Sequence, residues 1–475
     1  MNNYALFTFA LLILFTACKN EKQTTEKETS TFTPITDADY ENAVIYEANI
    51  RQYSPEGTFE AFTKDIPKLK ELGVKIIWLM PIHPISLTNR KATGDLSVHD
   101  IENEEERKKY LGSYYSISDY RGVNPEHGTK KDFQNLVDTA HENGMYVILD
   151  WVANHTGWDH EWIKTNPDFY NKNKDGEITD PLNSETGESW GWTDVAHLNY
   201  ENKDLWEAMK NDMLYWVKEH NIDGFRCDVA GEVPTEFWEF ITPQFKEVKP
   251  VFMLAESEKR DLFFNAFDMG YNWEGHHIKN EIAQGKQTVA QWDAYMQKVD
   301  STYQPDDFLM NFVTNHDENS WNGTVKERMG KASQAMLALS YTIPGMPLIY
   351  SGQEYDMDHR LKFFEKDEIP KTKGNIWPIL ERLGKLKAEN PALHGGKNAA
   401  AYNRIPTSSD ENILAFERSK NGKRVIYIAN MSAEESTFTM DFEGAFMDYM
   451  YEETVVMDKE TPYTFAPWHY VILVK

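Results

Sequence analysis

The chain has 475 residues, of which 41% are hydrophobic and 13% aromatic, and its formal net charge is −27. This length is sufficient for a large core and two or three domains. The negative charge repels phosphate groups and argues against DNA or RNA as a partner. The many tryptophans and tyrosines leave open a neutral or cationic ligand with flat faces that stack on aromatic rings.

The N-terminus resembles the signal of a bacterial lipoprotein. An apolar run from Ala5 to Phe15, too short to span a bilayer, is followed by Cys18, the position that is acylated in such proteins. No lysine or arginine precedes the run, and a frayed hydrophobic terminus is the alternative. We expect residues 1–18 to be a signal peptide and residues 19–40 a flexible tether. The protein would then be exported and membrane-anchored in the cell envelope, at the outer membrane or periplasmic face.

Only two cysteines occur in the chain. If Cys18 belongs to the signal, Cys227 stands alone in an apolar stretch and no disulfide framework exists. Between a reactive thiol and a small core residue, the surrounding sequence favours the core residue.

From residue 43 onward, predicted strands alternate with predicted helices. The helices are expected at 59–72, 129–143, 205–220, 236–249, 289–299, 331–343 and 376–387. The strands are expected at 44–50, 75–80, 146–152, 222–230, 251–256, 265–268, 309–314 and 347–350. This order predicts an α/β fold, a (β/α)8 TIM barrel over residues 41–394, with active groups at the C-terminal ends of the strands.

Two segments interrupt this alternation. Residues 156–199 are loop-like and would form an inserted domain after the third strand, and long insertions are normally functional. Its tryptophans are expected either to stack on sugars or to pack the insertion's own core: Trp158, Trp162, Trp190 and Trp192. Residues 395–475 give short strands and predict a C-terminal antiparallel β-sandwich domain.

Ionisable residues gather where four of the predicted strands end. Asp150 ends the third strand, Arg226 and Asp228 the fourth, Glu256 the fifth, and Asp317 follows the seventh. A structural ion pair would explain the second cluster alone, but four clusters at one rim favour catalysis. Arg226 and Asp228 share one face of their strand, so the guanidinium is expected to lower the pKa of that carboxylate.

These four clusters resemble, in order and spacing, the four motifs of the α-amylase family of retaining glycoside hydrolases and transglycosylases (glycoside hydrolase family 13). The resemblance extends from about residue 43 to the end of the chain. It implies that Asp228 is the nucleophile and Glu256 the general acid/base. It also implies that Asp317 is the third carboxylate, which grips the sugar hydroxyls.

The same resemblance implies residues that support these carboxylates or bind the sugar. Arg226 would orient the nucleophile, and Asp150 would support the site through hydrogen bonds. His155 and His316 would hydrogen-bond the sugar in the subsite being cleaved, and Tyr115 would stack on it.

Three further residues are candidate ligands or sugar contacts. Trp321 follows the seventh strand at the active rim, which makes it a candidate sugar contact. His276 and His277 invite a metal-site interpretation, but a surface loop on the rim is favoured.

The residue types fit the cleavage of an acetal. Glu256 would protonate the leaving oxygen, since burial in an apolar strand raises its pKa, while Asp228 stays ionised. We expect a separation of about 5 to 5.5 Å between the two carboxyl groups, the spacing for retention through a covalent intermediate.

The resemblance implies one metal ion, calcium, held by Asn154 and an acid of the inserted segment. In the matching stretch, residues 195–199, His197 stands where that acid would be. Histidine is a poor ligand for a hard cation, which makes structural calcium doubtful. The chemistry itself requires no cofactor.

The expected function is retaining hydrolysis of α-1,4-glucosidic bonds in starch, glycogen or maltooligosaccharides. The alternatives are an α-glucan transglycosylase and an enzyme of the cyclomaltodextrinase or neopullulanase type. A non-catalytic glycan-binding lipoprotein or a structural subunit would not need all three carboxylates. The sequence identifies no protein partner.

Overall fold

The computed structural model describes residues 32–94, 96–183 and 186–475. The expected signal peptide with Cys18, and the tether up to residue 31, lie outside these residues. Among the described residues, no helix has the length and apolar character that crossing a membrane requires.

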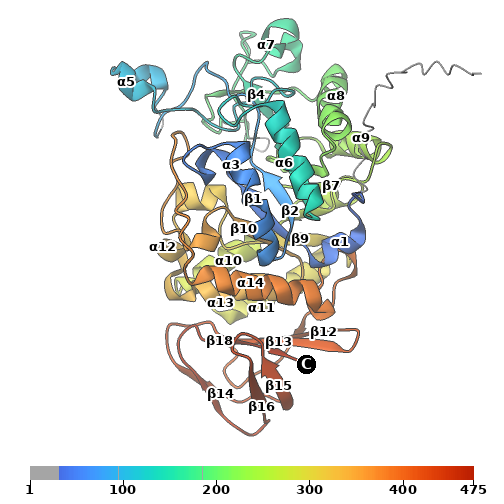
Figure 1. Cartoon of the computed structure of the whole chain (residues 1–475), viewed down its shortest axis with the longest axis vertical. Helices are drawn as coiled ribbons and strands as arrows, with labels where there is room; N and C mark the ends of the chain where they lie inside the picture. Colours follow the sequence, from blue (N-terminus) through green and yellow to red (C-terminus); the bar gives the residue numbers. More distant parts are fainter. Residues whose placement is uncertain (1–31, 95, 184–185) are drawn as a thin grey trace, which may run out of the picture. The chain divides into compact units, whose positions relative to one another are not determined.

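Eight parallel strands close into a barrel in the order β1-β10-β9-β8-β7-β6-β3-β2. Figure 1 labels β1, β2, β7, β9 and β10 among them. The eight strands are β1 (Val44–Ala48), β2 (Val74–Leu79), β3 (Tyr146–Trp151), β6 (Gly224–Cys227), β7 (Phe252–Ala255), β8 (Met269–Tyr271), β9 (Phe308–Asn311) and β10 (Met346–Tyr350). Almost every residue in them is buried, as parallel strands covered on both faces require. The predicted (β/α)8 barrel is confirmed, but the sixth strand was wrongly placed, since residues 265–268 form the turn that precedes β8.

Helices cover the outside of the barrel. The longer ones are α6 (Lys130–Glu142), α8 (Lys203–Glu219), α9 (Thr235–Lys246), α10 (Trp273–Ala283), α11 (Val289–Thr302), α13 (Ser333–Thr342) and α14 (Ile376–Glu389). Short helices are α1 (Asp37–Asn42), α2 (Ile50–Tyr53), α5 (Glu104–Arg107), α7 (Trp162–Thr165) and α12 (Val325–Met329).

Two helical regions differ from the prediction. The first expected helix is divided into α3 (Phe59–Thr63), α4 (Ile66–Leu69) and a 3-10 turn, Lys70–Leu72, because a proline occupies the first turn of α4. His276 and His277 do not lie in a rim loop; both belong to α10, and His276 is fully buried.

The insertion follows β3 directly, at the end of the barrel where the strands terminate. Its β4 (His155–Gly157) pairs antiparallel with β5 (Val195–His197). Trp162 is buried against Phe169, with ring centroids 5.4 Å apart, and so packs the insertion's own core.

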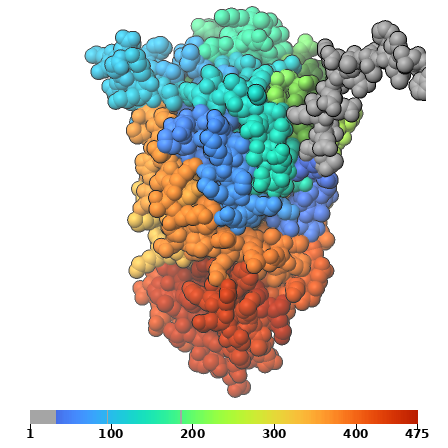
Figure 2. Space-filling view, in the orientation of Figure 1, coloured from blue at the N-terminus to red at the C-terminus, as the bar shows by residue number. Residues whose placement is uncertain are grey.

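The C-terminal region is antiparallel β structure, as predicted. A six-stranded sheet has the order β11-β12-β13-β18-β15-β16, and β14 pairs with β17. The strands are β11 (Asn403–Arg404), β12 (Ile413–Lys420), β13 (Lys423–Asn430), β14 (Ser436–Phe438), β15 (Gly444–Asp448), β16 (Glu453–Met457), β17 (Tyr463–Phe465) and β18 (Tyr470–Val474). Its surface, red in Figure 2, lies at the opposite end of the molecule from the insertion. It contacts the barrel through Arg418, which is buried and donates to the carbonyl oxygens of Thr342 and Ile343.

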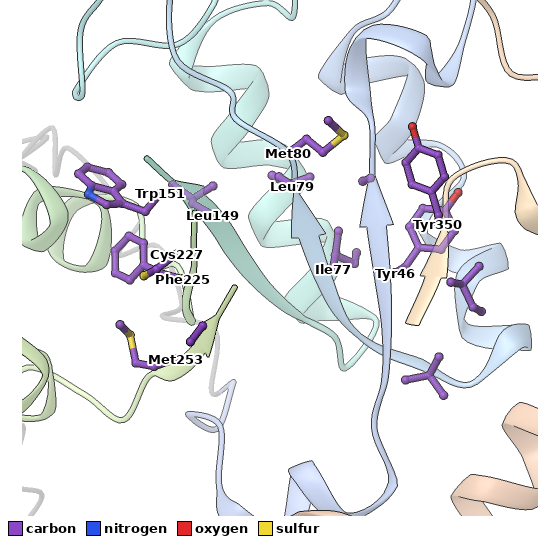
Figure 3. Close-up of a cluster of buried hydrophobic side chains, with 14 of the residues drawn as sticks. Tyr46, Ile77, Leu79, Met80, Leu149, Trp151, Phe225, Cys227, Met253 and Tyr350 are labelled. Carbon is purple, nitrogen blue, oxygen red and sulfur yellow. The ribbon is translucent and has the colours of Figure 1, made fainter. Parts of the chain in front are cut away.

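Cys227 lies among apolar side chains that include Trp151, Phe225 and Met253 (Figure 3). Burial raises the pKa of its thiol well above the usual value. These surroundings fit a small core residue rather than a reactive thiol.

Candidate active site

Arg226 lies at the centre of the polar cluster at the barrel rim. Its Nη1 is 2.9 Å from Oδ1 of both Asp150 and Asp228, and its Nη2 is 2.8 Å from Oε1 of Glu256. Its Nε donates to the hydroxyl of Tyr271 at 3.1 Å. Because β3, β6 and β7 are neighbours in the barrel, one buried guanidinium joins the ends of all three strands.

The carboxyl groups around Arg226 have raised pKa values. Burial raises the pKa of Asp150 and of Asp228 to about 6, although Arg226 opposes the shift. Burial likewise raises the pKa of Glu256 to about 7. The predicted lowering at Asp228 is therefore wrong, since desolvation and like charges outweigh one guanidinium. The raised pKa of Glu256 fits a carboxyl group that can carry a proton near neutral pH.

A second set of contacts involves the end of β9. His316 Nδ1 lies 2.5 Å from Oε1 of Glu47, and its Nε2 lies 2.7 Å from the Tyr115 hydroxyl and 3.3 Å from Oδ2 of Asp317. Burial lowers the pKa of His316, but the carboxylates of Asp317 and Glu47 outweigh it and raise the pKa to about 9. The imidazolium therefore donates to both sides at neutral pH. The Tyr115 hydroxyl in turn donates to Oδ2 of Asp150 at 3.1 Å, which links the two sets.

Glu47 is a site residue that the sequence analysis did not identify. It lies on β1, is fully buried, and contacts His316 across the closure of the barrel. The signal available was a single charged residue in an otherwise apolar strand, since acidic residues are rarely buried without a partner.

We expect Glu47→Gln to lower the pKa of His316 by about one to three units, because a neighbouring opposite charge shifts a pKa by that amount. Histidine titration followed by NMR measures this directly. Glu354→Gln is the matched control, since Glu354 is also buried but accepts its hydrogen bond from Tyr46. An unchanged His316 pKa in Glu47→Gln would contradict the assigned role.

The protein-family model for the α-amylase catalytic domain matches residues 22–376 of the chain. The protein belongs to the α-amylase family. Alpha-amylase 3 of Dictyoglomus thermophilum is 24% identical over 488 residues, which cover 88% of this chain and 91% of that enzyme. The cyclomaltodextrinase of Thermoanaerobacter pseudethanolicus is 25% identical over 415 residues, covering 82% and 66%. The α-amylase MalA of Haloarcula japonica is 25% identical over 415 residues, which cover 84% of this chain. The chain spans only 56% of the length of MalA.

Solved structures of α-amylases have the same fold. The α-amylase of Lactobacillus plantarum superposes with a TM-score of 0.79 at 29% identity, over 91% of this chain and 99% of that one. The maltogenic α-amylase AmyB of Thermotoga neapolitana gives a TM-score of 0.79 at 27% identity, over 91% and 98%.

Aromatic rings lie beside two of the predicted sugar contacts, His155 and Tyr115. On the insertion, Trp192 lies 5.8 Å from His155, and Trp190 stacks on Trp192 at 5.7 Å and 16°. The outer ring, Trp190, is 43% exposed.

The second aromatic surface follows β9 and β10. Trp321 is half exposed and lies 5.0 Å from Phe363, whose ring is parallel to that of Tyr115 at 6.3 Å. Phe363 was not predicted, because it lies in an irregular segment after β10 that no sequence periodicity marks.

The expected calcium ligand has nitrogen-rich surroundings. Asn154 is buried, with Nδ2 3.4 Å from Nδ1 of His155, and β4 places that histidine opposite His197. Nδ1 of His197 is 3.1 Å from the Asn171 amide. Calcium prefers oxygen ligands, so these residues do not fit the ion. Among the described residues, no group of three or more histidine, cysteine or acidic side chains is arranged to hold a metal ion.

Proposed function

We propose that the protein hydrolyses α-1,4-glucosidic bonds of starch, glycogen or maltooligosaccharides with retention of configuration. The observation that carries this proposal is the single guanidinium of Arg226 between Asp228 and Glu256. Its Nη1 donates a hydrogen bond to Asp228, which favours the ionised form of that group, while burial raises the pKa of Glu256 and favours its protonated form. A retaining glycosidase needs such a pair in different protonation states.

The reaction follows from these two groups. Asp228 attacks the anomeric carbon while the bond to the leaving oxygen breaks, and Glu256 gives that oxygen its proton. The resulting glycosyl ester is hydrolysed when Glu256, now ionised, takes a proton from water and the water oxygen displaces Asp228. No cofactor enters either step.

The neighbouring groups would hold the sugar during both steps. Asp317, with 36% of its side chain exposed, can accept hydrogen bonds from sugar hydroxyls, and the imidazolium of His316 can donate. The aromatic surfaces at Trp190 and Trp321 support binding of further glucose units.

Product analysis on amylose, pullulan and cyclodextrin, with anomeric configuration followed by NMR, tests this proposal. We expect α-configured maltooligosaccharides from amylose. Products longer than the substrate would indicate transglycosylation instead. Faster turnover of cyclodextrin or pullulan than of amylose would indicate an enzyme of the cyclomaltodextrinase or neopullulanase type. Binding of all three glycans without turnover would overturn the enzymatic assignment.

We further propose that the protein is exported and anchored to the membrane by acylation of Cys18. The apolar run before this residue and the polar tract after it support the anchor. We expect Cys18→Ala to move the protein from the membrane fraction to the soluble fraction, while Cys227→Ala remains membrane-bound. Membrane association of Cys18→Ala equal to that of the wild type would contradict the anchor.

A further inference from the structure

A buried polar cluster lies beside the segment that connects β9 to α12. It consists of His276, Lys279 and Asn280 of α10, Glu318, and Arg328 of α12, each at most 9% exposed. The proposed mechanism assigns no step to these residues. Charged groups are rarely buried to this degree without a specific arrangement of partners.

The cluster holds the backbone where β9 leaves the barrel. Lys279 Nζ donates to the carbonyl oxygen of Phe312 at 2.8 Å, and Nδ1 of His276 lies 3.2 Å from the same oxygen. The His276 ring also stacks on the Phe312 ring at 4.4 Å and 15°.

Arg328 contacts both ends of the same segment. Its Nη2 donates to the carbonyl oxygen of Val313 at 2.7 Å, and its Nε donates to that of Gly323 at 2.9 Å. Its Nη1 donates to Oδ1 of Asn280 at 2.7 Å. The guanidinium therefore fixes the start of the segment relative to its end and ties both to α10.

Glu318 completes the cluster from inside the segment, directly after Asp317. Its Oε2 lies 3.1 Å from Nε2 of His276 and 3.4 Å from Nη1 of Arg328. Its Oε1 accepts a hydrogen bond from the side-chain amide of Asn322 at 2.9 Å. Burial alone would raise the pKa of Glu318, but His276 and Arg328 outweigh it and lower the pKa to about 2.

We propose that His276, Lys279, Glu318 and Arg328 are positioning residues that fix the segment Phe312–Gly323 for catalysis. This segment carries His316, Asp317 and Trp321, so its backbone sets where the third carboxylate meets the sugar. A displacement of about 1 Å in such a group costs about 100-fold in rate. Stability alone does not require these charges, since well-packed apolar residues often replace buried ion pairs without loss. The inference rests on the proposed function, because it assigns the cluster an effect on that reaction.

The test compares two buried lysines. Lys279 donates to Phe312 O and to Oγ of Ser340, whereas Lys387 on α14 donates to the carbonyl oxygens of Gly345 and Leu393. We expect both Lys279→Met and Lys387→Met to lower the melting temperature. With maltoheptaose, at a temperature where circular dichroism shows both variants folded, only Lys279→Met should reduce kcat, by about 10- to 100-fold, with a smaller change in KM.

A second pair of variants covers the case in which Lys279→Met does not fold. Glu318→Gln keeps the shape of the side chain but removes its charge, and Glu327→Gln makes the same change at an exposed neighbour. We expect kcat to fall only in Glu318→Gln. Unchanged kcat in both Lys279→Met and Glu318→Gln, with an active wild type, would overturn the positioning role and leave the proposed function intact. An inactive wild type would instead contradict the proposed function.

Discussion

Asp228→Asn is expected to reduce kcat on maltoheptaose by about 10⁴-fold or more, the scale seen when a nucleophile is removed. Asparagine has nearly the same shape and can still accept a hydrogen bond from Arg226 through Oδ1. It cannot form the glycosyl ester. Because burial and neighbouring carboxylates raise the pKa of Asp228, removing its charge relieves repulsion, and we expect a melting temperature no lower than that of the wild type.

Asp223→Asn is the matched control for this variant. Asp223 is fully buried immediately before β6, where it pairs with Nε2 of His141 at 2.7 Å and with Nζ of Lys249 at 3.0 Å. It lies at the opposite end of the strand from Asp228, so its substitution should lower stability while kcat per folded molecule is retained. If Asp228→Asn kept more than about a tenth of the wild-type kcat, the nucleophile would have to be another group.

The residues at the ends of barrel strands could be predicted from the sequence for a simple reason. In a closed parallel barrel all C-terminal strand ends meet at one rim, so Asp150, Arg226 and Glu256 had to be close once their strands were recognised. The contact of Asp150 and Glu256 with the guanidinium of Arg226 follows from the adjacency of β3, β6 and β7.

Other features depended on packing that local sequence does not encode. Strand β8 has only three residues and contains Gly270, where an added Cβ would lie 2.5 Å from the Phe263 ring. Such a strand offers no apolar run to recognise. The side chain of Glu47 reaches its partner, His316, only because β1 and β10 pair and close the barrel. The two residues are 269 positions apart in the sequence.

The pKa of Asp228 shows why the Arg226–Asp228 ion pair alone does not predict the direction of a pKa shift. Arg226 and Asp228 are neighbours on one strand face, and considered alone they predict a lowered carboxylate pKa. Asp150 and Glu256 share the same guanidinium. Arg226, Asp150 and Asp228 are buried, and only 11% of the Glu256 side chain is exposed. The balance of several like charges in a desolvated site decides the direction of the shift.

Glu256→Gln is expected to reduce kcat on maltoheptaose by about 10²- to 10⁴-fold, the contribution of a general acid. Glutamine can still accept the hydrogen bond from the Val229 amide, which in the wild type is 2.7 Å from Oε2, so the fold should be retained. It has no proton to give to the leaving sugar oxygen. A dinitrophenyl maltoside has a leaving group that departs without protonation. With this substrate, Glu256→Gln should form the glycosyl ester at a rate much closer to that of the wild type.

This difference between substrates distinguishes an acid from a residue that merely holds the sugar. In the glycosylation step, which kcat/KM reports, loss of a sugar contact would slow both substrates equally, whereas loss of the acid slows mainly the one with the poor leaving group. The wild-type kcat/KM should also fall above about pH 7, the pKa of Glu256, because the acid must be protonated when the substrate binds. In Glu256→Gln, with the dinitrophenyl substrate, this alkaline limb should disappear. Its persistence would assign the limb to another group and contradict Glu256 as the acid.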